Sequence, residues 1–164
     1  MKNNPIVCVI LLVSLLAGTV ISLRAQSYQT ALGLRIDGSA GITAKHFVRP
    51  AWAVEGILHI QQRGLGLTGL GVRHIEPFPL AGLSVFAGGG VHAGYWNRLK
   101  ENPLFTGESR VILGLDAIAG AEYCPEKVPV SFGIDWKPML NLTGVEQDDR
   151  WVVNGALSVR YTFK

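Results

Sequence analysis

Residues 151–163 read WVVNGALSVRYTF, and an apolar or small side chain occupies every second position of this stretch. One face carries apolar residues such as Leu157 and Phe163, whereas the other carries Ser158 and Arg160. Side chains of a β-strand alternate between its two faces, so this period of two predicts a strand. Because the two faces differ in polarity, the strand is expected to separate an apolar environment from a polar one.

The same alternation recurs along the chain from Tyr28 onward, interrupted by short segments that contain Pro, Gly or polar residues. Such segments are typical of the turns that connect strands. A chain built from alternating stretches of this kind, without a helical period, is expected to be all-β. The pattern predicts eight strands, at residues 28–37, 41–48, 52–61, 65–75, 83–95, 110–123, 129–140 and 151–163.

The connections between the predicted strands fall into two kinds. Short, Pro-containing connections follow the second, fourth and sixth strands, whereas residues 96–109 and 142–150 form longer, polar connections. If successive strands run up and down, both long connections lie at one end and the Pro-containing ones at the other. Transmembrane β-barrels have this asymmetry, with short turns on one side of the membrane and longer loops on the other.

The composition favours a folded chain that exposes apolar surface to something other than water. Charged residues make up 16% of the 164 residues, against roughly 25% in an average soluble domain. The apolar fraction is 48% and the mean hydropathy is +0.28. A disordered chain would be poor in apolar residues, so disorder is excluded.

The N-terminus has the organisation of a secretory signal peptide. Lys2 precedes an apolar run over residues 6–21, and the chain turns polar at Gln26, after the small residue Ala25. A basic start, an apolar core and a small residue before the cleavage point define such a segment. We therefore expect a cleavable signal peptide over residues 1–25 and one mature domain over residues 26–164, with a retained membrane anchor as the alternative.

Charge gives no reason to expect nucleic acid as a partner. Without Lys2 and Arg24, the 15 basic residues of the chain fall to 13, against 12 acidic residues. A net charge of this size predicts no strong attraction to a polyanion. Cys124 is then the one cysteine left, so no internal disulfide is expected.

The charged residues of the predicted strands lie on the face opposite to the apolar one. A sheet that crosses lipid must close on itself, because lipid offers no hydrogen bonds to an open edge. We therefore predict a closed, antiparallel, up-and-down transmembrane β-barrel whose charges point inward. A soluble barrel with the opposite polarity, apolar inside, is the alternative. The predicted lumen charge network consists of Arg35, Glu55, Asp116, Glu122, Asp135, Lys137 and Arg160.

An eight-stranded barrel has an interior that side chains can fill. Buried charges need partners, so the inward cations are expected to pair with acids such as Asp116, Glu122 and Asp135. This predicts a filled lumen, with a narrow channel as the alternative.

Aromatic residues are expected near the strand ends, where they would form the girdles found at membrane interfaces. The predicted interfacial aromatic residues are Trp52, Tyr95, Tyr123, Trp136, Trp151, Tyr161 and Phe163.

The signal peptide, the alternating strands, the segment VSFGIDWKPML at 130–140 and the terminal LSVRYTFK at 157–164 together resemble small outer-membrane β-barrel proteins of Gram-negative bacteria. The resemblance covers the whole mature chain. It implies an outer-membrane location, contact with outer-membrane lipids, a monomer, and recognition of the C-terminal strand by the barrel-insertion machinery. Lys164 follows Phe163, whereas the commonest members of the class end on Phe.

No cofactor or metal is expected. Residues 64–69, GLGLTG, match a dinucleotide-binding pattern, but no helix is predicted after them, so a strand is the better interpretation. The four histidines, His46, His59, His74 and His92, lie on different predicted strands without the spacing of a metal site.

The leading hypothesis for function is a non-enzymatic outer-membrane barrel with a structural role or one mediated by residues 96–109 and 142–150. Some proteins of the class it resembles modify lipid A, using a histidine with a serine and often a carboxylate. A lipid-modifying enzyme, deacylase-like and using His46, His74 or His92, is therefore an alternative hypothesis, beside the narrow channel.

Overall fold

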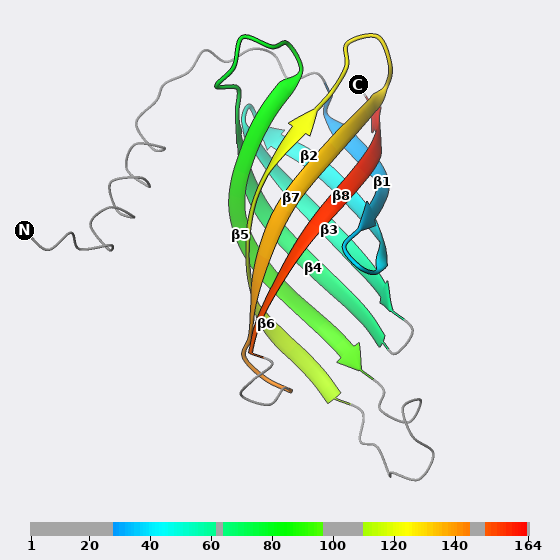
Figure 1. Cartoon of the computed structure of the whole chain (residues 1–164), viewed down its shortest axis with the longest axis vertical. Helices are drawn as coiled ribbons and strands as arrows, with labels where there is room; N and C mark the ends of the chain where they lie inside the picture. Colours follow the sequence, from blue (N-terminus) through cyan, green and yellow to red (C-terminus); the bar gives the residue numbers. More distant parts are fainter. Residues whose placement is uncertain (1–27, 62–63, 97–109, 145–149, 164) are drawn as a thin grey trace, which may run out of the picture.

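The computed structural model describes residues 28–61, 64–96, 110–144 and 150–163. They form eight strands, each antiparallel to the next (Figure 1). All eight predicted strands are confirmed, with ends that differ by at most two residues. The strands are β1 (Thr30–Ile36), β2 (Ala40–Arg49), β3 (Trp52–Gln61), β4 (Gly64–Ile75), β5 (Leu83–Trp96), β6 (Arg110–Tyr123), β7 (Val130–Asn141) and β8 (Trp151–Phe163).

The sheet closes where the first strand meets the last. β1 pairs with β8 in a register that runs from Thr30 opposite Phe163 to Ile36 opposite Leu157. The predicted closed antiparallel barrel is therefore confirmed, and none of the eight strands is left with an open edge. Residues 64–69 lie in β4, as the strand interpretation of this glycine-rich segment requires. Among the residues that the structure describes, no helix is long and apolar enough to cross a membrane.

The up-and-down order separates the connections between the two ends of the barrel. We call the end that carries Phe163 the C-terminal rim, which lies at the top of Figure 1. The connections at residues 50–51, 76–82 and 124–129 also lie there. We call the opposite end the loop rim. The strand ends on either side of residues 97–109 and 142–150 both lie at the loop rim, so the two long connections share one end.

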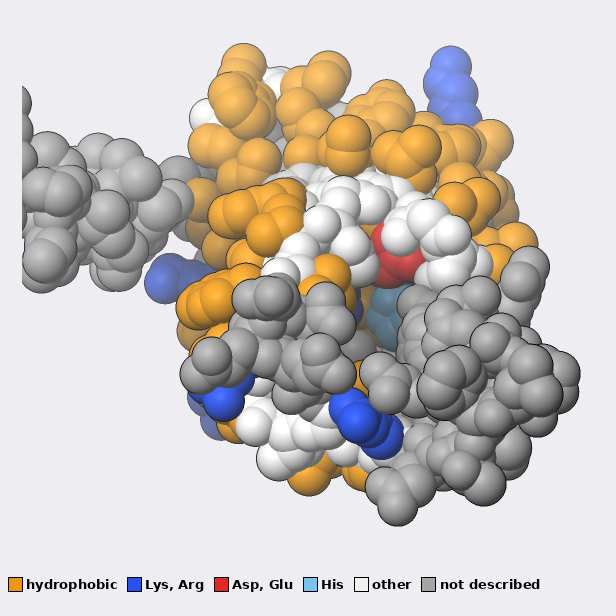
Figure 2. Space-filling model, turned by 60° about the horizontal axis from the view of Figure 1, so that its bottom comes forward, with side chains coloured by type: hydrophobic (Ala, Val, Ile, Leu, Met, Phe, Trp, Pro, Cys, Tyr) orange, Lys and Arg blue, Asp and Glu red, His pale blue; other side chains and the backbone are white. Residues whose placement is uncertain are grey.

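The wall of the barrel is apolar outside and polar inside. Apolar side chains such as Leu34 and Leu157 are 66% and 61% exposed on the outer wall, whereas the side chains of Arg35 and Arg160 in the same strands are buried in the interior. Hydrophobic side chains gather along the upper and left edges of the molecule in Figure 2. Soluble proteins bury their large apolar residues and expose their charges, so the polarity of this barrel is inverted.

Glycine allows a close approach where β1 meets β8. A Cβ atom on Gly33 would lie 2.0 Å from the carbonyl oxygen of Val159 and 2.5 Å from the Cα atom of Arg160. Both distances are shorter than van der Waals contact, and both involve backbone atoms that cannot rotate away. The seam of the barrel therefore has no room for a side chain at this position.

Candidate functional site: the charged interior

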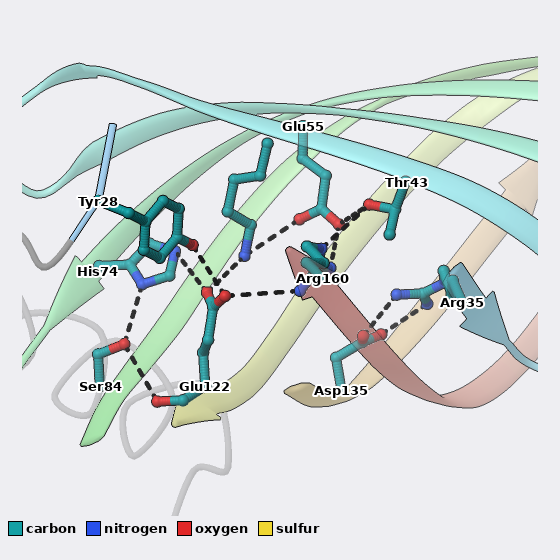
Figure 3. A network of polar contacts seen from close by, with 10 residues as sticks. Tyr28, Arg35, Thr43, Glu55, His74, Ser84, Glu122, Asp135 and Arg160 are labelled. Atoms are coloured by element: carbon teal, nitrogen blue, oxygen red, sulfur yellow. Dashed lines mark hydrogen bonds and ion pairs between the residues drawn. The ribbon is translucent and has the colours of Figure 1, made fainter. Parts of the chain in front are cut away.

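Two cations and two carboxylates meet inside the barrel, contributed by β2, β3, β6 and β8 (Figure 3). The Lys45 Nζ atom lies 3.0 Å from Glu122 Oε2 and 3.3 Å from Glu55 Oε2. Arg160 Nη2 lies 2.5 Å from Glu55 Oε1, and Arg160 Nη1 lies 3.6 Å from Glu122 Oε1. Each cation therefore contacts both carboxylates. We call these four residues the four-charge cluster, and its formal charge sums to zero.

Neutral hydroxyl groups also donate hydrogen bonds to the two carboxylates. Thr43 Oγ1 donates a hydrogen bond of 2.7 Å to Glu55, and the Tyr28 hydroxyl donates one of 2.8 Å to Glu122. Burial, together with the negative charge of Glu122, raises the pKa of the Tyr28 hydroxyl well above its usual range. Tyr28 therefore keeps its proton and acts as a donor, which is the role that a buried carboxylate requires.

Aromatic rings pack beside the four-charge cluster in the interior. Tyr28 packs edge-on against Phe47 at 5.3 Å between ring centroids, and Phe47 packs against His74 at 4.9 Å. His74 stacks on Phe86 at 5.0 Å, and the Lys45 ammonium lies 4.4 Å from the Phe86 ring. These rings contribute apolar packing and a cation–π contact to the interior next to the cluster.

A second group of charges joins β1 to β7 and continues toward the loop rim. The Arg35 guanidinium donates two parallel hydrogen bonds, of 2.5 and 2.6 Å, to the two oxygens of Asp135. Its Nε atom lies 3.6 Å from Asp37, which in turn lies 3.3 Å from the His59 ring nitrogen Nδ1. A two-pronged arginine–carboxylate pair fixes geometry better than a single contact does. β1 and β7, which are separated by β8 in the sheet, are thus tied together inside the lumen.

A third group lies nearer the loop rim, on β5, β6 and β7. His92 Nδ1 lies 3.0 Å from Asp116 Oδ1, and His92 Nε2 lies 2.9 Å from the amide oxygen of Asn141. Lys137 Nζ lies 3.9 Å from the same Asp116 oxygen. In Figure 2, acidic and histidine side chains are visible in the middle of the view, below the hydrophobic side chains of the upper edge. Polar groups therefore continue along the lumen from the four-charge cluster to this third group.

The structure places all seven residues of the predicted lumen network in the interior, each no more than 6% exposed. It distributes them among the three groups. Glu55, Glu122 and Arg160 belong to the first group, Arg35 and Asp135 to the second, and Asp116 and Lys137 to the third.

Lys45 was not among the predicted lumen residues, although it contacts both glutamates of the four-charge cluster. The alternation of the sequence does indicate that Lys45 points inward. Residues 41–48 alternate like the other strands, with Ile42 on the outer wall and both Thr43 and Lys45 in the other phase. Assigning a phase to this strand would have added both residues to the network.

The predicted interfacial aromatic residues are all exposed on the outer wall. Four of them lie at strand ends on the C-terminal rim, namely Trp52, Tyr123, Tyr161 and Phe163, and two lie at the loop rim, namely Tyr95 and Trp151. Trp136 differs, because it lies in the middle of β7. Its predicted place near a strand end is therefore wrong. The alternation of residues reports which face a side chain occupies, not its height along the barrel.

The histidines of the alternative enzyme hypothesis lie in three different surroundings. His46 is exposed on the outer wall and shares a 2.8 Å hydrogen bond with Thr30. His74 is buried and lies 3.1 Å from the hydroxyl oxygen of Ser84. His92 belongs to the third group of charges. Of these three histidines, His74 is the one next to a serine, Ser84, and the pair lies in the half of the barrel next to the C-terminal rim.

Asp37 lies in the connection between β1 and β2 at the loop rim. Burial by itself would raise the pKa of this carboxyl, but hydrogen bonds from His59 and Ser39 and the charges of His59 and Arg35 hold it well below its usual range. A carboxyl with a lowered pKa stabilises the fold above the unfolded-state pKa of about 3.9. That stabilisation is lost as the pH falls through the lower, folded-state pKa.

We therefore expect Asp37→Asn to lower the free energy of unfolding by about 1 kcal/mol near neutral pH. The difference from the wild type should stay constant down to about pH 4 and shrink below it. Guanidinium titrations of both proteins, followed by tryptophan fluorescence at several pH values, measure it. A difference that stays unchanged in strong acid would show that the charge of Asp37 is not what stabilises the fold.

The geometry defines a closed, eight-stranded antiparallel barrel with an apolar outer wall and a charged interior. Its fold is similar to that in the crystal structure of the N-terminal β-barrel domain of Pseudomonas aeruginosa OprF, with a TM-score of 0.59. The alignment covers 82% of this chain and 95% of that domain, at 13% sequence identity. No protein-family model matches the chain, and a search of curated proteins gave no match.

Proposed function

We propose that this chain is an integral outer-membrane β-barrel protein of a Gram-negative bacterium, with a structural role or one mediated by its long loops. The observation that carries the proposal is the inverted polarity of the wall. Leu34, Val91 and Leu157 are each about 60% exposed or more. Burying a side chain of this kind is favourable by about 1.5–3 kcal/mol. A wall covered with such residues is compatible with lipid and unfavourable in water.

The dimensions of the strands support the same proposal. β2, β3, β4 and β7 contain 10 to 12 residues each. A tilted strand needs about 9–11 residues to cross the hydrocarbon layer. The similarity of the fold to the OprF domain is consistent with this assignment.

We propose that the lumen is filled and conducts no solute. The four-charge cluster crosses it from β2 and β3 to β6 and β8, and Arg35 of β1 bonds to Asp135 of β7 inside it. The histidines have hydrogen-bond partners inside the same lumen or on the wall, and we propose structural roles for them instead of catalysis.

The two rims differ in a way that sets the proposed orientation. The long connections at residues 97–109 and 142–150 join strands at the loop rim, and outer-membrane barrels place their longer loops outside the cell. The C-terminal rim then faces the periplasm, and the outward Tyr161 and Phe163 of β8 are available there to the insertion machinery. We further propose that the protein is a monomer in contact with outer-membrane lipids.

Gel migration of the membrane-extracted protein tests the proposal. A closed barrel of this kind resists detergent, because unfolding it breaks the hydrogen bonds of all eight strand pairs together. We expect a fast-migrating band without heating and a slower band after boiling, both from the outer-membrane fraction. A protein recovered from the soluble fraction with a single, unshifted band would overturn the proposal.

A further inference from the structure

The pairing between β6 and β7 is interrupted at one place in the wall. Toward the loop rim, Asp116 pairs with Met139. Toward the C-terminal rim, the pairing resumes in the same register with Ala119 opposite Trp136. On the other side of β7, the pairing with β8 runs through Pro138 without a break. The positions left unpaired between β6 and β7 are Ala117, Ile118, Lys137 and Pro138.

Pro138 accounts for this interruption, because proline has no backbone N–H and removes one hydrogen bond from a sheet. In an antiparallel sheet, a hydrogen-bonded residue directs its N–H and its carbonyl to the same neighbouring strand. The break lies on the β6 side of Pro138, where the register places it opposite Ala117. Proline in a sheet is normally confined to edge strands, and this closed barrel has none. The Ala117 carbonyl therefore faces a nitrogen without a hydrogen and accepts no hydrogen bond from β7.

The open approach to this carbonyl is from the outer wall. On the inner face of the wall, Ile118 and Lys137 are buried in the packed interior. On the outer face, Ala117 is exposed and pairs with Gly89 of β5, which pairs in turn with Gly71 of β4. Both glycines are exposed as well, so no long side chain covers the backbone at these three positions. We call Gly71, Gly89 and Ala117 the carbonyl site.

We propose that the carbonyl site binds a hydroxylated acyl chain, whose hydroxyl group donates a hydrogen bond to the Ala117 carbonyl. The inference rests on the proposed membrane location. Ala117 is the eighth of the 14 residues of β6, which places it within the hydrocarbon layer of that location. Hydrocarbon offers no donor, and an unsatisfied backbone group costs several kcal/mol there. A hydroxyl carried by an acyl chain supplies the donor at this depth, while the chain itself packs against the two glycines.

Native mass spectrometry tests the site with the protein folded in dodecyldimethylamine oxide, a detergent without hydroxyl groups. 12-Hydroxystearic acid and stearic acid are added separately, and the retained acid is counted. We expect the wild type to retain the hydroxylated acid about fivefold more, as one net hydrogen bond predicts. Pro138→Ala supplies the missing N–H to Ala117 and should abolish this preference. Pro129→Ala is the matched control, because Pro129 lies in the connection between β6 and β7 at the C-terminal rim, outside the paired strands, and it should keep the preference.

Gly71→Leu tests the site without changing the backbone donors. The nearest atom to a Cβ at Gly71 is the Gly89 carbonyl oxygen at 4.0 Å, so leucine fits there and covers the approach to Ala117. This variant should also lose the preference. Equal retention of the two acids by the wild type, or a preference that persists in Pro138→Ala, would overturn the site. Each sample is also run on a gel with and without boiling. A heat-shifted band without a preference contradicts this inference alone, whereas an unshifted band from soluble protein contradicts the proposed function as well.

Discussion

Arg160→Met is expected to lower the free energy of unfolding by about 3–5 kcal/mol. Arg160 contacts Glu55 and Glu122, and Lys45 also contacts both. Without the guanidinium, two buried carboxylates share one ammonium group, and one negative charge stays uncompensated in the lumen. Methionine has a similar length and keeps the apolar contacts. The loss in free energy of unfolding therefore reports the missing charge more than the missing volume. Guanidinium titration of the protein in lipid vesicles gives the value.

A second variant separates charge balance from packing. Arg160→Met combined with Glu55→Gln leaves one cation and one carboxylate in the cluster, so it should be less destabilised than the sum of the single variants. Arg150→Met is the matched control, because Arg150 is exposed just before β8. If Arg160→Met costs no more than Arg150→Met, the four-charge cluster does not stabilise the barrel.

Gly33→Ala is expected to destabilise the barrel by about 1–3 kcal/mol or more, although it adds a single methyl group. That methyl would lie 2.0 Å from the Val159 carbonyl oxygen, so β1 and β8 must move apart at the seam. The expected result is a lower yield of the fast-migrating folded band and a lower guanidinium midpoint. The band yield and the guanidinium midpoint are both measured on the same preparations of the wild type and the variant.

Gly56→Ala is the control for this variant. Gly56 lies in β3 on the outer wall, and no heavy atom lies within 4 Å of the position that its Cβ would take. Alanine in a strand interior is favoured over glycine by roughly 0.5–1 kcal/mol, so this variant should be as stable as the wild type or slightly more stable. Equal stability of Gly33→Ala and Gly56→Ala would show that the seam is looser than its backbone distances indicate.

The strands and the two faces of the wall could be predicted because both depend on local sequence. Alternation within residues 151–163 is enough to place Arg160 inward and Leu157 outward, since neighbouring side chains of a strand must point to opposite faces. The same rule locates the inward acids and cations one strand at a time.

The contacts between those inward residues could not be predicted in the same way. Arg35 bonds to Asp135, and Arg160 bonds to Glu55, inside the lumen, and each pair joins strands that are not neighbours in the sheet. Which inward residues share a height depends on the tilt of the strands and on the stagger of the closed sheet. Neither property can be read from the alternation of residues. For the same reason, the sequence predicts Trp136 near a strand end, whereas this residue lies in the middle of β7.

The pairing of β1 with β8 also determines when the barrel can be completed. The two strands of the seam stand at opposite ends of the described chain, so their contacts have nearly the largest sequence separation that this protein allows. Contacts between distant residues slow folding, because the entropy of a long loop must be lost before they form. An incomplete chain lacks β8 and exposes the unpaired edge of β1. The topology therefore makes pairing of β1 with β8 the last event in completing the barrel.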